Sequence, residues 1–450
     1  MDWLRALLGV LAMIVCGASL LALLPRGRRA EDRWLDLALS VPLGMLAVAA
    51  AYALFDLLHA PLHLLPMTAA WLLLALLVRT FRRRVPSPQP APAAAPGEPR
   101  ALTVVFAALL IASDVTAVAM TVSRPVSGTD PMGIWSARAV LIHERGDLDS
   151  RELARATFYP PLLPCSLAWL MDAVGARDFV RIKLVNPLLM LALQLFLVRS
   201  MRGRVPTWIA LFGALVLCSS PVFQACVREP FADLPFMALF TVATVMLIDV
   251  AEGDLRALAL VLTTTLAAAL ARTEGIPAAP GMILLAAWLW PERRRALAIA
   301  LGGGACVVAG VALAVWRFKG YQPFGAPQGF AADSRAAGER IRANSTYILG
   351  YFVERMRRCD RFGYTLLLPL CALACRARAL WRDRAVQIAL GVTFWLIAVH
   401  YASYIVYPGD VRQHLPLSGD RVPYRFTFPL LVAALLAVGS RAAAAPASSR

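Results

Sequence analysis

Apolar stretches of about 20 residues recur along the whole chain, separated by short segments that carry most of the charge. An α-helix of that length crosses the hydrocarbon core of a bilayer. Backbone groups in lipid must bond within their own segment, so repeated stretches predict helices, whereas a barrel would alternate in segments of about 10 residues. The pattern predicts an all-α fold, a polytopic transmembrane bundle of about 13 helices. The expected spans are 3–24, 35–57, 62–80, 101–122, 179–198, 207–224, 233–250, 257–271, 276–290, 296–316, 362–380, 385–406 and 424–441.

Arginine predicts the orientation of these spans. Five short connections are strongly basic, and with the spans above all of them fall on one side, which the positive-inside rule makes cytoplasmic. The N-terminus and two long loops, 123–177 and 317–361, then lie outside. We expect the protein in the inner (plasma) membrane of a bacterium, with its functional residues facing the non-cytoplasmic side. The basic connections are 26–33, 79–84, 199–204, 293–295 and 376–384.

The chain also suggests a division into parts. Residues 85–100 are rich in Pro and Ala without periodicity, which predicts a flexible cytoplasmic linker. It would separate three accessory helices (1–84) from a catalytic bundle (101–441), which a cytoplasmic tail (442–450) follows. The region 257–290 fits two short spans or one broken span. In the second outer loop, the apolar face around Tyr347 to Phe352 fits either a helix lying in the membrane interface or one packed on the protein.

Composition agrees with a membrane solvent. Hydrophobic residues make up 59% of the chain and charged residues 16%, with a mean hydropathy of +0.64; soluble proteins are usually about 45–50% apolar and about 25% charged. The net charge of +17 would suggest nucleic acid in a soluble protein. Here much of the arginine lies in short loops, so orientation and membrane lipid explain it, and we expect no nucleic-acid partner. Walker and dinucleotide motifs are absent from the sequence.

Five polar segments are expected on the outer side. In the first, Asp130 precedes a proline and is followed by Trp135 and Arg138 at helical spacing. A carboxylate there could act as a general base on a hydroxyl, or simply cap a helix. In the second, Tyr159 is followed by three prolines, which predict that a helix starts only after Pro164.

The third and fourth segments hold paired charges. Glu229 and Asp233 follow Arg228, and Arg272 stands two residues before Glu274. Ionisable groups so close to hydrocarbon are costly unless they are paired or used. Structural ion pairs, with Arg228 in one segment and between Arg272 and Glu274 in the other, are the alternative to a functional role.

The fifth segment precedes the last span and contains His414, Asp420, Arg421 and Arg425. The planar fork of arginine suits bidentate binding of phosphate. Arg421 and Arg425 could therefore converge with Arg272 on a phosphate group at the level of the lipid headgroups. Ordinary snorkelling to the interface is the alternative.

The order of these segments resembles the GT-C class of membrane glycosyltransferases. The order is an outer-loop Asp followed by Trp and a basic residue, then Tyr-Pro-Pro-Leu, Ala-Asp-Leu-Pro, Arg-x-Glu-Gly, and Ser-x-Asp-Arg before the last span. Over residues 101–440 it looks more narrowly like the branch of the protein O-mannosyltransferases and of the aminoarabinose transferase that modifies lipid A. The resemblance implies a GT-C type bundle with catalytic loops on the outer face. It also implies transfer of a hexosyl or pentosyl group from a polyprenyl-phosphate carrier.

The resemblance also implies roles for the candidate residues. Asp130 matches the catalytic acid of the first loop, and both Glu229 and Asp233 fit the second acidic position. Arg138 and Arg272 stand where related sequences have lysine, a change that keeps the charge. Two acids sharing a cavity could hold a divalent metal, for which the sequence assigns no ligand set. The donor-phosphate residues expected are Arg138, Arg272, Arg421 and Arg425; those contacting substrate are Trp135, Tyr159, Glu274, His414 and Asp420.

The predicted reaction is a single displacement. The lipid phosphate leaves already ionised and needs cations, while Asp130 takes the proton of an acceptor hydroxyl, so the anomeric centre inverts. The sequence identifies neither the sugar nor the acceptor, which is a glycan, lipid or protein. A transporter or flippase of a lipid-linked saccharide is the alternative, and its polar residues should line a path through the bilayer. A non-catalytic membrane scaffold is a third hypothesis.

Overall fold

The computed structural model describes residues 1–25, 32–60, 63–81, 99–149, 151, 159–318, 334–357, 365–405, 411–412, 415 and 421–439. Apart from an isolated bridge between Arg202 and Val205, the regular structure in these residues is helical, which confirms the all-α prediction. The helices are α1 (Asp2–Leu23), α2 (Arg33–Leu57), α3 (Leu64–Phe81), α4 (Arg100–Val122), η1 (Pro131–Ser136), α5 (Ala137–Arg145), α6 (Leu162–Val174), η2 (Arg181–Leu184), α7 (Val185–Ser200), α8 (Thr207–Cys218), α9 (Pro221–Arg228), α10 (Asp233–Val250), α11 (Leu255–Ala271), α12 (Gly275–Leu289), α13 (Arg293–Arg317), α14 (Ser334–Arg357), α16 (Leu367–Cys375), α17 (Ala377–Arg382), α18 (Arg384–Ile405) and α20 (Val422–Gly439).

Long apolar helices dominate the described residues. Eight of them are long and apolar enough to cross a membrane, and α8 with α9 passes the same test as a pair bent by 75°. Shorter apolar helices are α3, α6, α11 and α12. This is the make-up of an integral multi-pass membrane protein, as the hydropathy pattern predicted. The eight are α1, α2, α4, η2 continued by α7, α10, α13, α18 and α20.

The chain forms two compact units. The first comprises Met1–Ala93, Ile111–Ser200 and Cys226–Pro323; the second comprises Ala94–Leu110, Met201–Ala225 and Phe324–Arg450. Residues 85–98 of the expected linker and the expected tail 442–450 lie outside the described residues. The division into accessory and catalytic helices stays a prediction.

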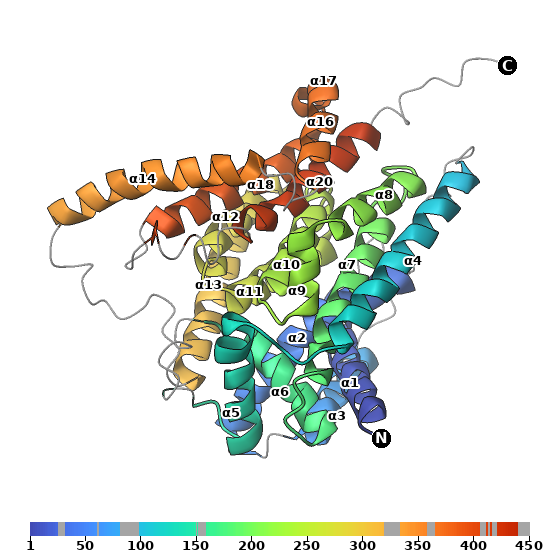
Figure 1. Ribbon diagram of the computed structural model, residues 1–450, viewed down its shortest axis with the longest axis vertical. Coiled ribbons are helices and arrows are strands. Elements are labelled where there is room, and N and C mark those ends of the chain that lie inside the picture. The colour runs from blue at the N-terminus through green and yellow to red at the C-terminus, as the bar shows by residue number, and fades with distance from the viewer. Residues whose placement is uncertain are drawn as a thin grey trace. The chain divides into compact units, whose positions relative to one another are not determined.

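The core of the first unit surrounds α10, which packs against α7 and α11 and is buried along its whole length (Figure 1). The N-terminal helices belong to this core, because α1 packs on α2 and α6 while α2 packs on α6 and α7. Helices α1 and α2 meet at glycines: a Cβ on Gly17 would lie 1.9 Å from the carbonyl oxygen of Ser40. Small residues allow such close approach of two apolar helices.

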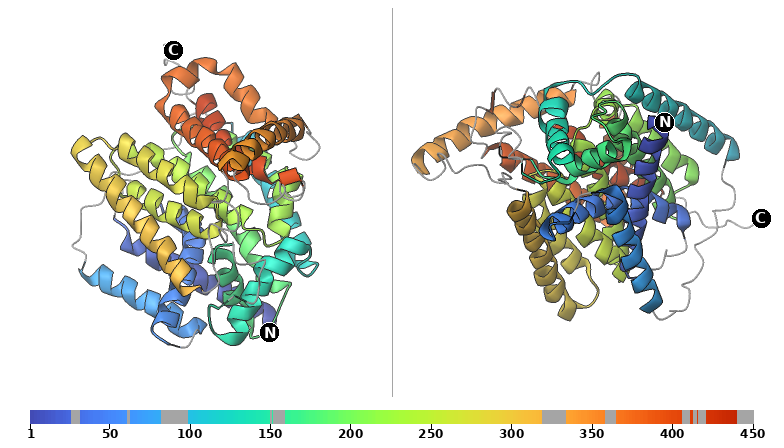
Figure 2. Two further views of the ribbon diagram at one scale, coloured as in Figure 1. Left: turned by 90° about the vertical axis from the view of Figure 1, so that its left-hand side faces the viewer. Right: turned by 90° about the horizontal axis from the view of Figure 1, so that it is seen from below.

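Helices α11 and α12 form a hairpin of two short helices, which answers the question left open for 257–290. Gly275 makes the tight turn feasible, since a Cβ there would lie 2.2 Å from the carbonyl oxygen of Ala268. Helix α13 packs along both members of the hairpin (Figure 2). The glycine of the Arg-x-Glu-Gly segment therefore has a structural role: it lets α12 begin close to the backbone of α11.

In the second unit, α20 packs against α8, α16 and α18. Helix α14 lies on α18 through the apolar face noted in the sequence: Ile348 is fully buried against Tyr404 and Val422, and Phe352 packs beside it. The hydroxyl of Tyr401 donates to the carbonyl oxygen of Ser345 over 3.3 Å. This face of α14 is thus packed on the protein.

Candidate functional site

Asp130 lies at the start of an unusual helical turn. It precedes η1, a π-helical turn that runs directly into α5, and Gly128, with φ of +86°, lets the chain turn into it. Asp130 is the N-cap of η1 and Pro131 is the first residue of that turn, as the helix-cap interpretation expects, but the half-buried Asp130 side chain makes no capping hydrogen bond to η1. Short π-helical turns occur often at functional sites, so the position of Asp130 beside η1 is typical of a functional residue.

Trp135 and Arg138 hold the second segment in place. The rings of Trp135 and Tyr159 meet edge to face with centroids 4.9 Å apart, and Nη1 of Arg138 donates to the carbonyl oxygen of Tyr159 over 2.5 Å. The Arg138 guanidinium also lies 5.8 Å from the ring centroid of Phe318. Both Trp135 and Arg138 are buried. The structure thus brings together two segments that the sequence analysis linked only by their order.

The helix after Tyr159 begins earlier than expected. Helix α6 starts at Leu162, so Pro164 lies in its first turn, and the prediction of a later start is wrong. The physical reason is that the first N–H groups of a helix have no carbonyl partner within it, so a proline there removes no hydrogen bond.

Glu229 is bound by residues from two other segments. Its carboxylate accepts from the Ser127 backbone N–H at 3.0 Å and the Ser127 hydroxyl at 2.8 Å. The Lys183 ammonium lies 4.0 Å from Oε1 of Glu229. Asn186 donates to the carbonyl oxygens of Glu229 at 2.5 Å and Cys226 at 2.8 Å. Because Ser127 is three residues before Asp130, these contacts bring the first and third segments together.

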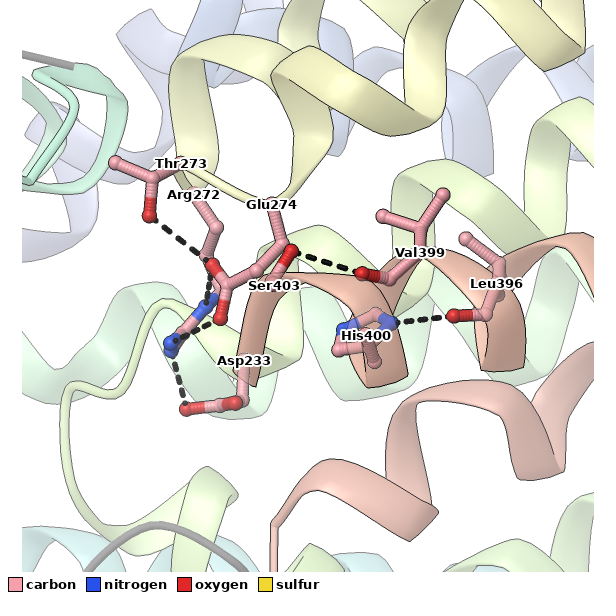
Figure 3. Close-up of polar contacts among 8 residues, drawn as sticks. All are labelled: Asp233, Arg272, Thr273, Glu274, Leu396, Val399, His400 and Ser403. Carbon is pink, nitrogen blue, oxygen red and sulfur yellow. Dashed lines mark hydrogen bonds and ion pairs between the residues drawn. The ribbon is translucent and has the colours of Figure 1, made fainter. Parts of the chain in front are cut away.

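Asp233 and Glu274 hold Arg272 between them, as Figure 3 shows. Nη1 of Arg272 donates to Asp233 Oδ2 at 3.0 Å, while Nε and Nη2 each donate to one oxygen of Glu274 at 3.1 Å. Thr273 adds a bond from its hydroxyl to Glu274 at 3.2 Å. Burial lowers the pKa of Arg272, but the carboxylates of Asp233 and Glu274 outweigh it and raise that pKa well above its usual value. Tyr159 is within electrostatic range of the same guanidinium.

The ion pairs differ in part from those the sequence suggested. The local pair between Arg272 and Glu274 forms as expected. Asp233 takes Arg272 as a partner and Glu229 takes Ser127 with Lys183, partners that the sequence analysis did not name. These four segments lie at helix ends: after α4, before α6, between α9 and α10, and between α11 and α12. Contacts link the first segment to the second and to the third, and the third to the fourth.

The fifth segment belongs to the second unit. Arg421 is half-buried and directly precedes α20, and Arg425 is fully buried in its first turn. On the preceding helix, α18, His400 donates from Nδ1 to the carbonyl oxygen of Leu396 over 2.7 Å (Figure 3). His414 and Asp420 lie outside the described residues. The expected convergence of Arg272 with Arg421 and Arg425 joins residues of two units and stays a prediction.

Sequence reasoning missed Lys183 and Asn186. A signal was present: the chain has 45 basic residues of the Lys and Arg types, yet only Lys183 and Lys319 are lysines. A lysine near the start of an apolar span is also unusual by itself. Asn186 carried no such signal, because a lone asparagine in an apolar helix is compatible with many structural roles.

Among the described residues, no three His, Cys, Asp or Glu side chains gather as a metal site. Comparisons with protein-family models, curated proteins and solved structures find no match to this chain. The resemblance to GT-C glycosyltransferases therefore stays a prediction based on its own residues.

Proposed function

We propose that this protein is a GT-C type membrane glycosyltransferase that moves a sugar from a polyprenyl-phosphate carrier to an acceptor hydroxyl on the non-cytoplasmic face. The observation that carries the proposal is the contact network of the first unit. Trp135 and Arg138 contact Tyr159, Ser127 contacts Glu229, and Asp233 and Glu274 share Arg272. Four of the five segments whose order resembles the family are thus linked by contacts within one unit.

The reaction we propose is a direct displacement at the anomeric carbon. The acceptor oxygen forms a bond to that carbon, the bond to the phosphate oxygen breaks, and the acceptor proton passes to Asp130. The lipid phosphate leaves as an anion, so cations must stabilise it in place of a proton donor. Asp130 suits the role of base because it lies at the start of η1 with a half-buried side chain, and Ser127, three residues before it, binds Glu229.

Of the two acids in the third segment, Glu229 is better placed to meet a substrate. Its side chain is 20% exposed, whereas that of Asp233 is 1% exposed and bound to Arg272. We assign Asp233 the role of positioning Arg272. The three bonds to Asp233 and Glu274 use three of the five N–H donors of the guanidinium, which leaves donors for a phosphate oxygen.

Arg272 is not sufficient for the phosphate, since two carboxylates accompany its one positive charge. Arg138, Arg421 and Arg425 are the further cations that we propose for the carrier phosphate. Each of these guanidinium groups can donate two parallel hydrogen bonds to two oxygens of one phosphate.

The proposal is tested with purified protein in lipid vesicles. The donors are a panel of radiolabelled undecaprenyl-phosphate sugars, hexoses and pentoses, and a detergent extract of bacterial envelope supplies acceptors. We expect carrier-dependent transfer by the wild type. Asp130→Asn should lower the rate by about 10²–10⁴, the range for loss of a general base.

Glu144→Gln is the matched control, because Glu144 lies in α5, the helix that follows η1, and pairs with Arg177 at the surface. Exposed pairs contribute little, so this variant should keep its activity. Wild-type activity in a folded Asp130→Asn variant would show that the base is another residue. If intact donor moved across the vesicle membrane without any sugar transfer, the enzyme proposal would be wrong and the protein would be a transporter of the lipid-linked sugar.

A further inference from the structure

The ammonium group of Lys183 is buried, and few contacts compensate for the water it has lost. Its side chain is 1% exposed, and its ion-pair partner Glu229 lies 4.0 Å from the nitrogen. Within the part of the chain that the structure describes, Lys183 makes no hydrogen bond through its side chain. An ammonium group has three N–H donors and is costly to bury unsatisfied. The Lys183 ammonium therefore has donors available for a ligand.

Asn186 supplies the complementary acceptor. Its amide nitrogen is fully used by the carbonyl oxygens of Cys226 and Glu229, which fixes the orientation of the side chain. Its Oδ1 is buried with no hydrogen-bond partner among the described residues. Lys183 and Asn186 are three residues apart on the continuous helix η2–α7, so they lie on one face, and both contact residue 229.

The charges favour a neutral ligand group at this point. Lys183 and Glu229 together are neutral, and the Glu229 carboxylate would repel a phosphate oxygen. A phosphate diester also has no N–H or O–H to offer Asn186. A hydroxyl both accepts and donates, so it can accept from Lys183 and donate to Asn186 or Glu229. Glu229 is 20% exposed and Ser127 is exposed, so the group reaches the surface at Glu229, while Lys183 and Asn186 are buried.

We infer that Lys183, Asn186 and Glu229 form a subsite for hydroxyl groups of the transferred sugar, separate from the residues that bind the carrier phosphate. The inference rests on the proposed function, since it names the part of the donor that this group binds. It assigns Lys183 a role in recognising the sugar.

The small number of lysines makes a direct test feasible. Protein grown with lysine labelled by ¹³C at Cε carries the label at Lys183 and Lys319 alone, and the variant Lys319→Arg identifies the Lys183 resonance. The labelled protein in lipid nanodiscs is titrated with undecaprenyl phosphate and, separately, with the panel of undecaprenyl-phosphate hexoses and pentoses. We expect a sugar-bearing lipid to shift the Lys183 resonance, and the bare lipid phosphate to leave it in place.

Binding constants of the same lipids give the second measurement. Lys183→Met should weaken binding of the sugar-bearing lipid about tenfold or more, as expected for loss of a hydrogen bond from a charged group. Its affinity for the bare lipid phosphate should stay within about twofold of the wild type. Lys319→Met, which removes the other lysine, is the matched control and should change neither constant. The resonance shift uses the wild-type site, so it tests the subsite even if Lys183→Met does not fold.

The outcomes separate this inference from the proposed function. Equal weakening of both lipids by Lys183→Met would mean that Lys183 binds phosphate, and the sugar subsite would be wrong while the enzyme proposal stood. The sugar subsite would also be wrong, and the enzyme proposal would stand, if the wild type bound the bare lipid phosphate as tightly as every sugar-bearing lipid. Failure of the wild type to bind either kind of lipid would reject the glycosyltransferase proposal and the subsite with it.

Discussion

Arg272 and Asp233 are 39 positions apart in the chain, and Nη1 of the arginine donates to Oδ2 of the aspartate over 3.0 Å. This bond ties the end of α11 to the start of α10, and Glu274 binds the other edge of the same guanidinium. Removing one partner from a buried ion pair leaves an uncompensated charge and costs about 3–5 kcal/mol. Arg272→Met should therefore destabilise the protein by about that amount in thermal or chemical unfolding.

Arg295→Met is the control for this prediction. Arg295 pairs with Glu292 at 3.0 Å, but both side chains are more than half exposed. Surface pairs are worth about 0–1 kcal/mol, so this variant should unfold close to the wild type. Equal unfolding of the two variants would mean that the Arg272 cluster does not stabilise the first unit.

The contact between α1 and α2 predicts that Gly17 cannot be enlarged. A Cβ there would meet the carbonyl oxygen of Ser40 at 1.9 Å, and backbone atoms cannot yield as a side chain can. Gly17→Ala should therefore force the two helices apart and destabilise the protein by about 1–3 kcal/mol or more. Thermal unfolding in detergent measures the effect.

Gly302 is the control for this prediction, because alanine there should not destabilise the protein. It lies in α13 with no atom within 4 Å of its would-be Cβ. Alanine is favoured over glycine in helices by about 0.5–1 kcal/mol, so Gly302→Ala should be neutral or stabilising. A tolerated Gly17→Ala would contradict the observed packing of α1 on α2.

A polar contact inside the apolar part of the first unit predicts a non-additive pair of mutations. Gln194 of α7 donates to Asp114 Oδ1 of α4 over 2.8 Å, and both residues are buried. Gln194→Leu leaves a buried acceptor without this donor, which costs about 1–3 kcal/mol. Replacing both residues by leucine should recover most of that loss, because no such acceptor then remains. A double-mutant cycle of unfolding free energies checks this, and strictly additive effects would contradict it.

Asp178 predicts a specific loss of stability in acid. Its carboxylate accepts from the backbone N–H of Val180 at 2.9 Å and of Arg181 at 2.8 Å, and it pairs with the Arg181 side chain. Burial by itself would raise the pKa of Asp178, but these contacts outweigh it and lower the pKa below its ordinary value of 3.8. The unfolded chain then binds the proton more tightly, so the stabilisation is present above pH 3.8 and is lost as the pH falls through the lower, folded pKa.

Asp178→Asn separates this effect from those of other carboxylates. Asparagine can still accept the two backbone bonds but carries no charge for Arg181. The wild type should unfold at a higher temperature than the variant at about pH 6, and the difference should shrink towards about pH 3. A difference that stays constant with pH would show that Asp178 is not ionised in the folded protein.

The sequence by itself determined the class of the fold and the local features. Apolar stretches long enough to cross a membrane require helices, because lipid offers no partner for backbone groups. Each of the described long apolar helices accordingly coincides with an expected span. The pair of Arg272 and Glu274 was also accessible, since residues two apart at a helix end are close in almost any fold. Interactions between residues that are close in the chain can therefore be predicted from the sequence alone.

Only the tertiary structure decided which distant groups meet. The sequence offered Arg228 as the partner of Glu229 and Asp233, yet Asp233 binds Arg272 of another helix end, and Glu229 lies beside Lys183. Nearly uniform apolar helices contain little information on which face turns towards which neighbour. That choice depends on close packing, as where the glycines of α1 and α2 let two backbones touch. The relative rotation of the helices then fixes the partner of each charged side chain at their ends.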